Sequence, residues 1–248
     1  MSRDLSRLLI VAFICVSAAF STNEAHAHGV TLKVHHFLPA DSPFHTKFLL
    51  PWLAKLEDES HGLLRFQVSP AMDIARLYDQ VKDRTADIVW TAVGNPTGRF
   101  PAFEVFKLPL AIHSAPGSSR ALWEYVQAND LAKKEFAGVR LLAAQVSSVE
   151  SNENAQVLSD VFVFAMNAEV YKSLSDELKK VIIANSGAQT SALLGKMFAT
   201  RRDTAAANLQ LSQSIIDEKI KELDQRGLDG KELLDSARAL LAEFDPQK

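Results

Sequence analysis

The segment from His36 to Phe44 holds the side chains best suited to contacting a small ligand. It follows a short strand expected over residues 32–38 and leads into a helix that Ser42-Pro43 should start. Open α/β sheets bind ligands where their parallel strands end, and a helix N-terminus attracts anions. His36, Phe37 and Phe44 are therefore candidate contacts for an anionic ligand. The alternative is a capped turn whose two phenylalanines belong to the core.

Trp90 and Thr91 extend the same candidate ligand-binding site, because they end a strand expected over residues 86–90. Arg99 lies in the loop after this strand and could reach the same edge, where a guanidinium can pair with a carboxylate. A tryptophan at a strand end also fits a core position, and Arg99 also fits a solvent-exposed position. The sequence leaves both alternatives open.

The sequence contains no pattern typical of a metal-binding site or of a catalytic site. His35 and His36 are adjacent on a strand, so they point to opposite faces and cannot ligate one ion. The chain has no His-Glu-x-x-His string, no glycine pattern for phosphates or dinucleotides, and no Gly-x-Ser-x-Gly turn. We therefore expect no metal, no cofactor and no enzymatic activity.

Strands and helices alternate through the first half of the chain. Apolar residues recur at helical spacing over residues 48–56, and they alternate with polar residues over 64–68, as in a half-buried strand. The short loops between these segments favour a parallel pair of strands. A further helix is expected over residues 73–84 and a further strand over 139–146. The pattern predicts an α/β lobe with a mainly parallel sheet over residues 28–146.

The second half of the chain is organised differently. Residues 147–160 are mostly polar and are interpreted as a linker or surface loop. Val161 to Met166 is apolar throughout, which is typical of a strand buried on both faces. Helical patterns then cover residues 176–207, 209–226 and 231–244. Residues 161–248 are therefore predicted to form one strand and a helical region.

Residues 1–27 have the pattern of a cleavable export signal, with an uncleaved signal anchor as the alternative. Arg3 and Arg7 precede an apolar run over residues 8–20, and Ala25-His26-Ala27 fits the specificity of signal peptidase. Cys15 is the only cysteine, so the exported part has no thiol or disulfide chemistry. The formal net charge of −3 excludes a strongly basic nucleic-acid-binding surface. We expect a periplasmic protein that is not embedded in the membrane.

Several short strings occur in an order typical of one protein family. They are Val34-His35-His36-Phe37-Leu38-Pro39, Leu77-Tyr78-Asp79-Gln80-Val81-Lys82, Ala86-Asp87-Ile88-Val89-Trp90-Thr91, Phe100-Pro101, Val163-Phe164-Ala165-Met166-Asn167 and Gly227-Leu228-Asp229-Gly230. Together they resemble the DctP-type solute-binding subunit of TRAP (tripartite, ATP-independent) transporters. The resemblance implies a periplasmic-binding-protein-like lobe, a small organic acid as the ligand and membrane permease subunits as partners.

The resemblance is interrupted between Val146 and Val161. Family members have there a Gly-Leu-Lys-Ile-Arg strand, whose arginine pairs with the ligand carboxylate, and a Val-Asp-Gly motif; neither string occurs in this sequence. We therefore expect an internally shortened member with a truncated second lobe and long C-terminal helices. The strand over residues 161–166 should join the sheet of the first lobe, because an unpaired apolar strand would leave an aggregation-prone edge. The alternative function is an exported, non-catalytic remnant or interaction protein that has lost ligand binding.

Overall fold

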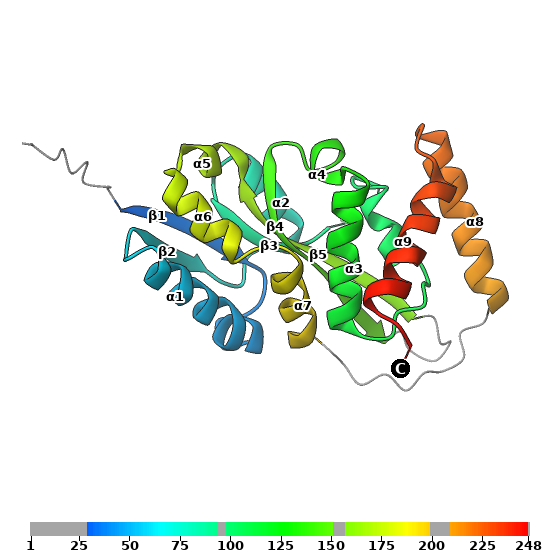
Figure 1. Ribbon diagram of the computed structural model, residues 1–248, viewed down its shortest axis with the longest axis horizontal. Coiled ribbons are helices and arrows are strands. Elements are labelled where there is room, and N and C mark those ends of the chain that lie inside the picture. Colours follow the sequence, from blue (N-terminus) through cyan, green and yellow to red (C-terminus); the bar gives the residue numbers. More distant parts are fainter. Residues whose placement is uncertain (1–28, 94–97, 151–156, 199–208, 248) are drawn as a thin grey trace, which may run out of the picture.

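The first three strands of the protein form the parallel part of its sheet (Figure 1). The computed structural model describes residues 29–93, 98–150, 157–198 and 209–247. The first elements are β1 (Val30–His36), η1 (Phe44–Leu49), α1 (Leu50–Glu59), β2 (Leu64–Ser69), α2 (Ile74–Lys82) and β3 (Ile88–Ala92). β1 pairs in parallel with β2 on one side and with β3 on the other, which confirms the predicted strand-helix-strand units.

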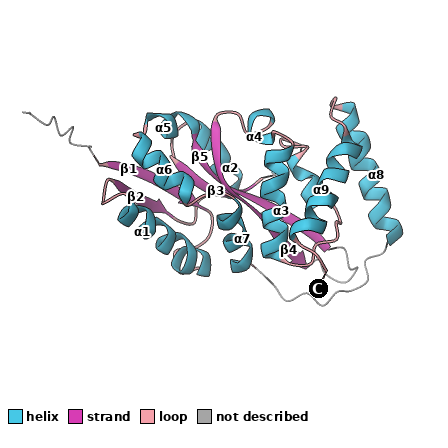
Figure 2. Cartoon of the chain, viewed as in Figure 1, coloured by secondary structure: helices cyan, strands magenta, loops and turns pink. Residues whose placement is uncertain are grey.

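Two long strands complete the sheet, and they run antiparallel to their neighbours (Figure 2). β4 (Val139–Glu150) and β5 (Val157–Asn167) pair with each other, and β5 also pairs with β3, from Ile88 opposite Met166 to Ala92 opposite Phe162. The strand order is β2-β1-β3-β5-β4. The predicted joining of residues 161–166 to the first sheet is therefore confirmed.

The sheet is mixed, because β5 runs against the other four strands; the strands within residues 28–146 all run in one direction, as expected for a mainly parallel lobe. Its β2-β1-β3 half is parallel and its β3-β5-β4 half is antiparallel. The reason lies in the connection between the last two strands, because β4 ends at Glu150 and β5 begins at Val157. A parallel pair needs a crossover of a dozen or more residues. A connection as short as this one therefore permits only an antiparallel pair.

The polar segment expected as a linker over residues 147–160 is corrected where the structure describes it. Residues 147–150 continue β4 and residues 157–160 begin β5, and the register runs from Ser147 opposite Asp160 to Glu150 opposite Val157. Polar residues fit these strands because backbone pairing with a partner strand does not require apolar side chains. Residues 151–156 lie outside the described part of the chain.

The remaining elements are helices, and most of them belong to the second half of the chain. They are η2 (Phe103–Lys107), α3 (Ala115–Ala128), α4 (Leu131–Lys134), α5 (Ala168–Ser173), α6 (Asp176–Ala184), α7 (Ala188–Met197), α8 (Leu209–Gln225) and α9 (Gly230–Phe244). α8 and α9 match the last two predicted helices. The helix predicted over residues 176–207 is instead broken between α6 and α7, because Gly187 takes a left-handed φ of 93° and donates its N–H to Leu142 O.

Apolar cores cover both faces of the sheet. On one face α1, α6 and α7 pack against a core that includes Val34, Ile88 and Trp90. On the other face α2, α3 and α9 pack against a core that includes Val89 and Val163. Alternation along β3 therefore sends Trp90 to the first face and its neighbours to the second.

Two helical serines cover the outer edge of β4. Ser191 Oγ of α7 accepts the N–H of Ala144 at 3.0 Å, and Ser119 Oγ of α3 accepts the N–H of Val146 at 3.0 Å. Exposed strand edges can pair with strands of other chains, and covering them with helices prevents this. The edge of the shortened sheet is thus protected by α3 and α7, which lie side by side in front of it (Figure 1).

The contact between α3 and α7 requires a glycine, which makes it a target for mutation. A Cβ atom at Gly195 would meet the carbonyl oxygen of Ala115 and lie 2.5 Å from Ser119 Oγ. We expect Gly195→Ala to lower the free energy of unfolding by about 1–3 kcal/mol, since backbone atoms cannot move aside cheaply. Urea unfolding measures this change.

Helix propensity alone predicts the opposite sign for this substitution, because alanine is favoured over glycine inside a helix by about 1 kcal/mol. A stabilised Gly195→Ala protein would therefore show that the two helices separate without cost. The matched control is Lys196→Ala at the neighbouring exposed position, which should change stability by less than about 0.5 kcal/mol.

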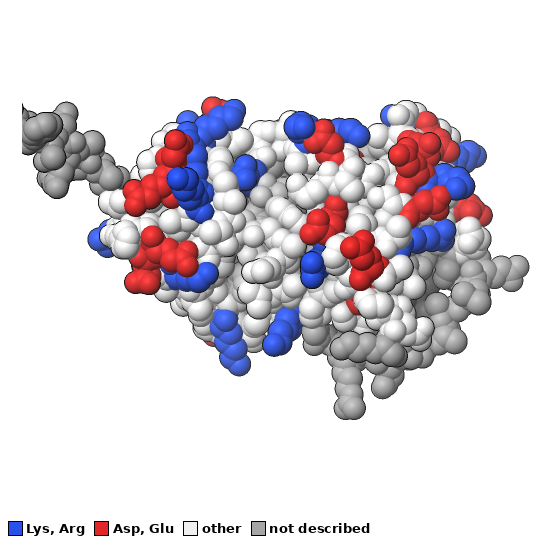
Figure 3. All heavy atoms as spheres, viewed as in Figure 1, with Lys and Arg blue, Asp and Glu red and all other residues white. Residues whose placement is uncertain are grey.

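Acidic and basic side chains are interspersed on the face that carries α3, α6, α7 and α9 (Figure 3). Neither sign dominates there, as expected for a chain of 27 basic and 30 acidic residues. A nucleic-acid-binding face needs clustered Lys and Arg. This face therefore lacks the charge pattern of such a surface.

Candidate functional site

Five aromatic rings gather at the ends of β1 and β3, and we call them the aromatic cluster. Its members are Phe37, Phe44, Trp90, Phe162 and Phe198. The pairing of His36 with Trp90 places the ends of the two parallel strands side by side. Phe37 directly follows β1, and Phe44 begins η1 after the turn at Ser42-Pro43. The chain thus brings its candidate ligand contacts to the carboxyl edge of the parallel strands.

The rings of the aromatic cluster are nearly parallel and centre on Trp90. Its indole lies 4.0 Å from Phe44 and 4.7 Å from Phe37, at interplanar angles of 20° and 13°. Phe162 and Phe198 lie 5.3 and 5.2 Å from the same indole, at 17° and 23°. Trp90 and Phe44 are each 1% exposed, whereas the other three rings are only partly buried. The cluster therefore combines a buried ring pair with partly exposed rings at its border.

A buried pair of histidines adjoins the aromatic cluster. His36 Nε2 and His45 Nδ1 are 2.8 Å apart, so one ring donates a hydrogen bond to the other. Burial, followed by the neighbouring His45 and His35, lowers the pKa of His36 to about 4. His36 is therefore neutral at physiological pH. Its Nδ1 atom has no hydrogen-bond partner among the described residues.

Gln145 of β4 adjoins the cluster from the opposite side. The indole Nε1–H of Trp90 donates to Gln145 Oε1 at 3.2 Å. The side chain is completely buried, and its Nε2 atom has no partner among the described residues. Two of the buried polar groups at this site thus have unused hydrogen-bonding capacity, one on each side of the Trp90 strand.

Of the six candidate site residues, the structure brings His36, Phe37, Phe44 and Trp90 together. Thr91 was expected at the same rim but faces the other side of the sheet, because neighbouring strand residues alternate. It is buried, and its hydroxyl donates to Ile74 O at 3.3 Å. Arg99 also lies away from the cluster, because it donates to Asp79 at 2.8 Å and stacks over Tyr78.

The sequence did not single out His45, Gln145, Phe162 or Phe198 as site residues. His45 directly follows the predicted ligand segment, which ends at Phe44, so its position was a usable signal. Phe162 belongs to the strand whose joining to the first sheet was predicted, and pairing with β3 then places it near Trp90. Gln145 and Phe198 reach the indole only through the folded arrangement of β4 and α7, which no local pattern indicates.

The described histidine, cysteine and acidic side chains form no group of three that could hold a metal ion. No lysine or arginine in the described ranges stacks over a ring of the aromatic cluster. Among the described residues, the buried side-chain groups with unused hydrogen-bonding capacity are uncharged: the amide of Gln145 and the imidazole of His36. Uncharged donors and aromatic faces suit a small organic ligand with one ring and a hydrogen-bond acceptor.

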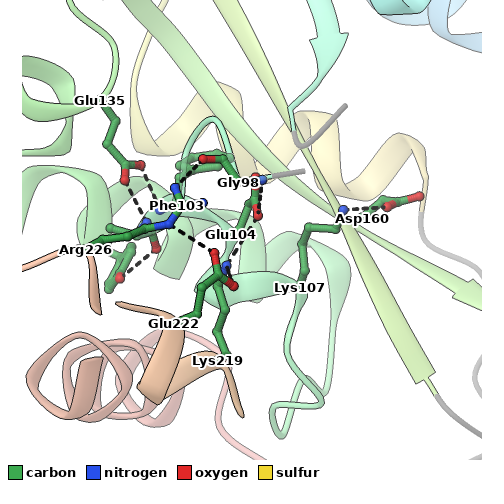
Figure 4. A network of polar contacts seen from close by, with 11 residues as sticks. Gly98, Phe103, Glu104, Lys107, Glu135, Asp160, Lys219, Glu222 and Arg226 are labelled. Carbon is green, nitrogen blue, oxygen red and sulfur yellow. Dashed lines mark hydrogen bonds and ion pairs between the residues drawn. The ribbon is translucent and has the colours of Figure 1, made fainter. Parts of the chain in front are cut away.

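A second group of polar side chains lies where α8 meets the segment around η2 (Figure 4). Glu104 accepts the N–H of Gly98 at 3.0 Å and pairs with Lys219 at 3.4 Å. Glu135 accepts the N–H groups of Ala102 at 2.7 Å and Phe103 at 2.9 Å; burial raises its pKa, which these two hydrogen bonds partly oppose. These carboxylates fasten α8 and η2 to the body of the protein. These contacts give both carboxylates a structural role.

A groove of about 530 Å³ lies away from the aromatic cluster, between α9 and the segment after η2. Its buried acidic group, Asp245, accepts hydrogen bonds from His113 N, Ser114 N and Ser114 Oγ. This carboxylate is therefore satisfied, and its role is to anchor the end of α9. The groove offers no unpaired buried polar group of the kind found at the cluster.

Comparison with known proteins places this architecture in one family. A model of the family described as bacterial extracellular solute-binding protein, family 7 (DctP) matches residues 34–161, just over half of the 248 residues. A search of curated proteins finds no match.

Solved structures that resemble the chain are TRAP solute-binding proteins. One from Rhodoferax ferrireducens, in complex with copurified benzoate, has 27% identity and a TM-score of 0.73, with 87% of this chain and 98% of that chain covered. A marine metagenome protein specific for aromatic acid ligands, in complex with 3-hydroxybenzoate, has 25% identity and a TM-score of 0.78, with 88% and 99% covered. A Bordetella bronchiseptica protein with bound mandelate shares the fold at 15% identity, with a TM-score of 0.72 and 87% and 100% covered.

Proposed function

Because this chain belongs to the bacterial extracellular solute-binding protein family 7, we propose that it captures a small organic acid and delivers it to the membrane permease of a TRAP transporter. The similar solved structures are TRAP solute-binding proteins, and those of Rhodoferax ferrireducens and the marine metagenome hold benzoate and 3-hydroxybenzoate. The family consists of binding proteins, which supports a role in binding and not in catalysis.

The observation that carries the proposal is the aromatic cluster at the carboxyl edge of the parallel strands. Trp90 and Phe44 form a buried ring pair there, and partly exposed rings border it. Aromatic rings prefer offset-stacked or edge-to-face arrangements, which contribute about 0.5–1.5 kcal/mol beyond the burial of their area. An organic acid that carries a ring therefore suits this site, with His36, Phe37, Phe44 and Trp90 as the proposed ligand contacts.

Export to the periplasm completes the proposal. The expected signal over residues 1–27 lies outside the described residues, and its basic head, apolar run and cleavage pattern support export. Within the described ranges, no helix has the length and apolar character needed to cross a membrane. The protein would then meet its permease at the outer face of the cytoplasmic membrane.

A second candidate function is an exported, non-catalytic interaction protein that no longer binds an acid. The connection between β4 and β5 favours it, because only residues 151–156 separate the two strands. The strand motif that carries the family's ligand-pairing arginine was expected between Val146 and Val161, and this motif does not occur in the sequence. The two functions make opposite predictions for ligand binding.

Thermal unfolding with a panel of acids separates the two functions. We expect benzoate, 3-hydroxybenzoate or mandelate to raise the melting temperature, because a ligand that binds only the folded state stabilises it by about 2.7 kcal/mol at 100 times its Kd. For a protein of this size that corresponds to a rise of about 5–10 °C. Cyclohexanol, which has a ring and no carboxylate, serves as the control. A cooperative transition that no acid in the panel shifts would support the interaction protein instead.

A further inference from the structure

Gln145 carries a buried amide group whose orientation is determined by its neighbour. An indole nitrogen can only donate a hydrogen bond, so the atom of Gln145 that lies 3.2 Å from Trp90 Nε1 must be the amide oxygen. The NH₂ end of the side chain therefore points elsewhere. It meets no acceptor among the described residues, although Gln145 is completely buried.

An unpaired buried NH₂ group is unusual, because on folding it loses its hydrogen bonds to water and gains none in return. Nearly all buried polar groups in folded proteins have a partner, so an exception calls for a physical explanation, such as local strain or a bound water or ion. The NH₂ group of Gln145 offers two N–H donors next to the aromatic cluster. The chemical complement of these donors is an oxygen acceptor, and a carboxylate oxygen is a strong one.

Phe198 is the ring of the cluster that a ligand can most readily displace. It follows the last residue of α7, is only partly buried, and lies 5.2 Å from Trp90 and 6.1 Å from Phe44. The stack of Trp90 on Phe44, at 4.0 Å, lies beneath it as a buried platform. Removing Phe198 would leave a place beside the same indole whose nitrogen donates to Gln145, while Phe37 and Phe162 continue to stack on it.

We propose that the Gln145 amide donates a hydrogen bond to the carboxylate of a small aromatic acid, whose ring takes the place of Phe198 against Trp90. This inference rests on the proposed function, and it assigns the ligand class and the carboxylate-binding residue. One molecule satisfies both observations, since its ring stacks on the indole and its anion pairs with the unused donors. His36 Nδ1 is a separate unpaired atom, because β1 and β4 lie on opposite sides of β3 in the sheet.

An uncharged amide takes the role that the missing arginine has in the family. A hydrogen bond to a charged group contributes about 1.5–3 kcal/mol, which corresponds to a factor of about 10–100 in affinity. The amide keeps its two donors at every pH at which the protein is folded. Affinity for the acid should therefore be independent of pH between about 6 and 8, where benzoate is ionised.

The test is calorimetric titration of the purified full chain with benzoate and with toluene, which has the ring without the carboxylate. We expect the wild type to prefer benzoate, and Gln145→Leu to lose about 10–100-fold in benzoate affinity with unchanged toluene affinity. Gln127→Leu, at an exposed position on α3, is the matched control and should bind both compounds as the wild type does. Equal benzoate affinity of Gln145→Leu and the wild type would overturn the role of Gln145.

Phe198→Ala provides an independent measurement if Gln145→Leu does not fold. Removing the competing ring should raise the affinity for benzoate several-fold, whereas an ordinary core residue would lower stability without raising affinity. Unchanged or weaker benzoate binding by Phe198→Ala would overturn the displacement. A wild type that binds an aliphatic acid but no aromatic acid would overturn this inference alone, whereas a wild type that binds no organic acid would overturn the proposed function as well; the two failures are thus distinguishable.

Discussion

Replacing Trp90 with alanine is expected to lower the free energy of unfolding by about 3–5 kcal/mol, because a large, completely packed ring leaves a cavity when it is removed. Trp90 is 1% exposed and stacks on Phe44 at 4.0 Å. Its loss also leaves Gln145 Oε1 without its donor. Urea unfolding followed by far-ultraviolet circular dichroism measures the change, and the proposed ligand platform should be lost with it.

Trp123→Ala is the matched control for this prediction. Trp123 lies on α3, is only partly buried, and packs against Gly187. Its removal should cost roughly 1 kcal/mol, as is usual outside a packed core. Equal losses for the two substitutions would show that the aromatic cluster is no better packed than the surface of α3.

The stability of the protein should fall by about 3 kcal/mol between pH 6.5 and pH 4 through His36 alone. Burial, His45 and His35 lower its pKa from 6.5 to about 4, and each pKa unit corresponds to 1.36 kcal/mol. In this range the unfolded chain binds a proton that the folded chain excludes, so stability rises with pH. The contribution is complete above pH 6.5 and is lost progressively as the pH falls to about 4.

The measurement is the slope of unfolding free energy against pH for the wild type and for His36→Gln, which removes the titrating group. We expect the substituted protein to have the shallower slope, whatever its absolute stability. His113→Gln, at an exposed histidine, should retain the slope of the wild type. Parallel slopes for the wild type and His36→Gln would contradict the exclusion of a proton from His36. Acidic groups contribute equally to each protein and so leave the comparison intact.

Local sequence patterns predicted many of the elements and part of the site. The alternation over residues 64–68 and the helical spacing over 48–56 correspond to β2 and α1, and the ends of β1 and β3 do bring His36, Phe37, Phe44 and Trp90 together. Such patterns are informative because a helix or strand with one buried face must repeat its apolar residues at its own structural period. The prediction for Thr91 was wrong, because the alternation of side chains along β3 sends it to the opposite face of the sheet.

Local sequence patterns were sufficient to predict the α/β class, the parallel pairing of the first strands and the entry of residues 161–166 into their sheet. Each follows from short loops and from apolar residues that must avoid water, which are properties of neighbouring residues. Only the tertiary structure decided that β4 and β5 form an antiparallel pair reaching into the polar segment, and that Gln145 and Phe198 meet Trp90. The contacts of Trp90 with Gln145 and Phe198 join residues 55 or more positions apart, and such approaches depend on the packing of the whole sheet and its helices.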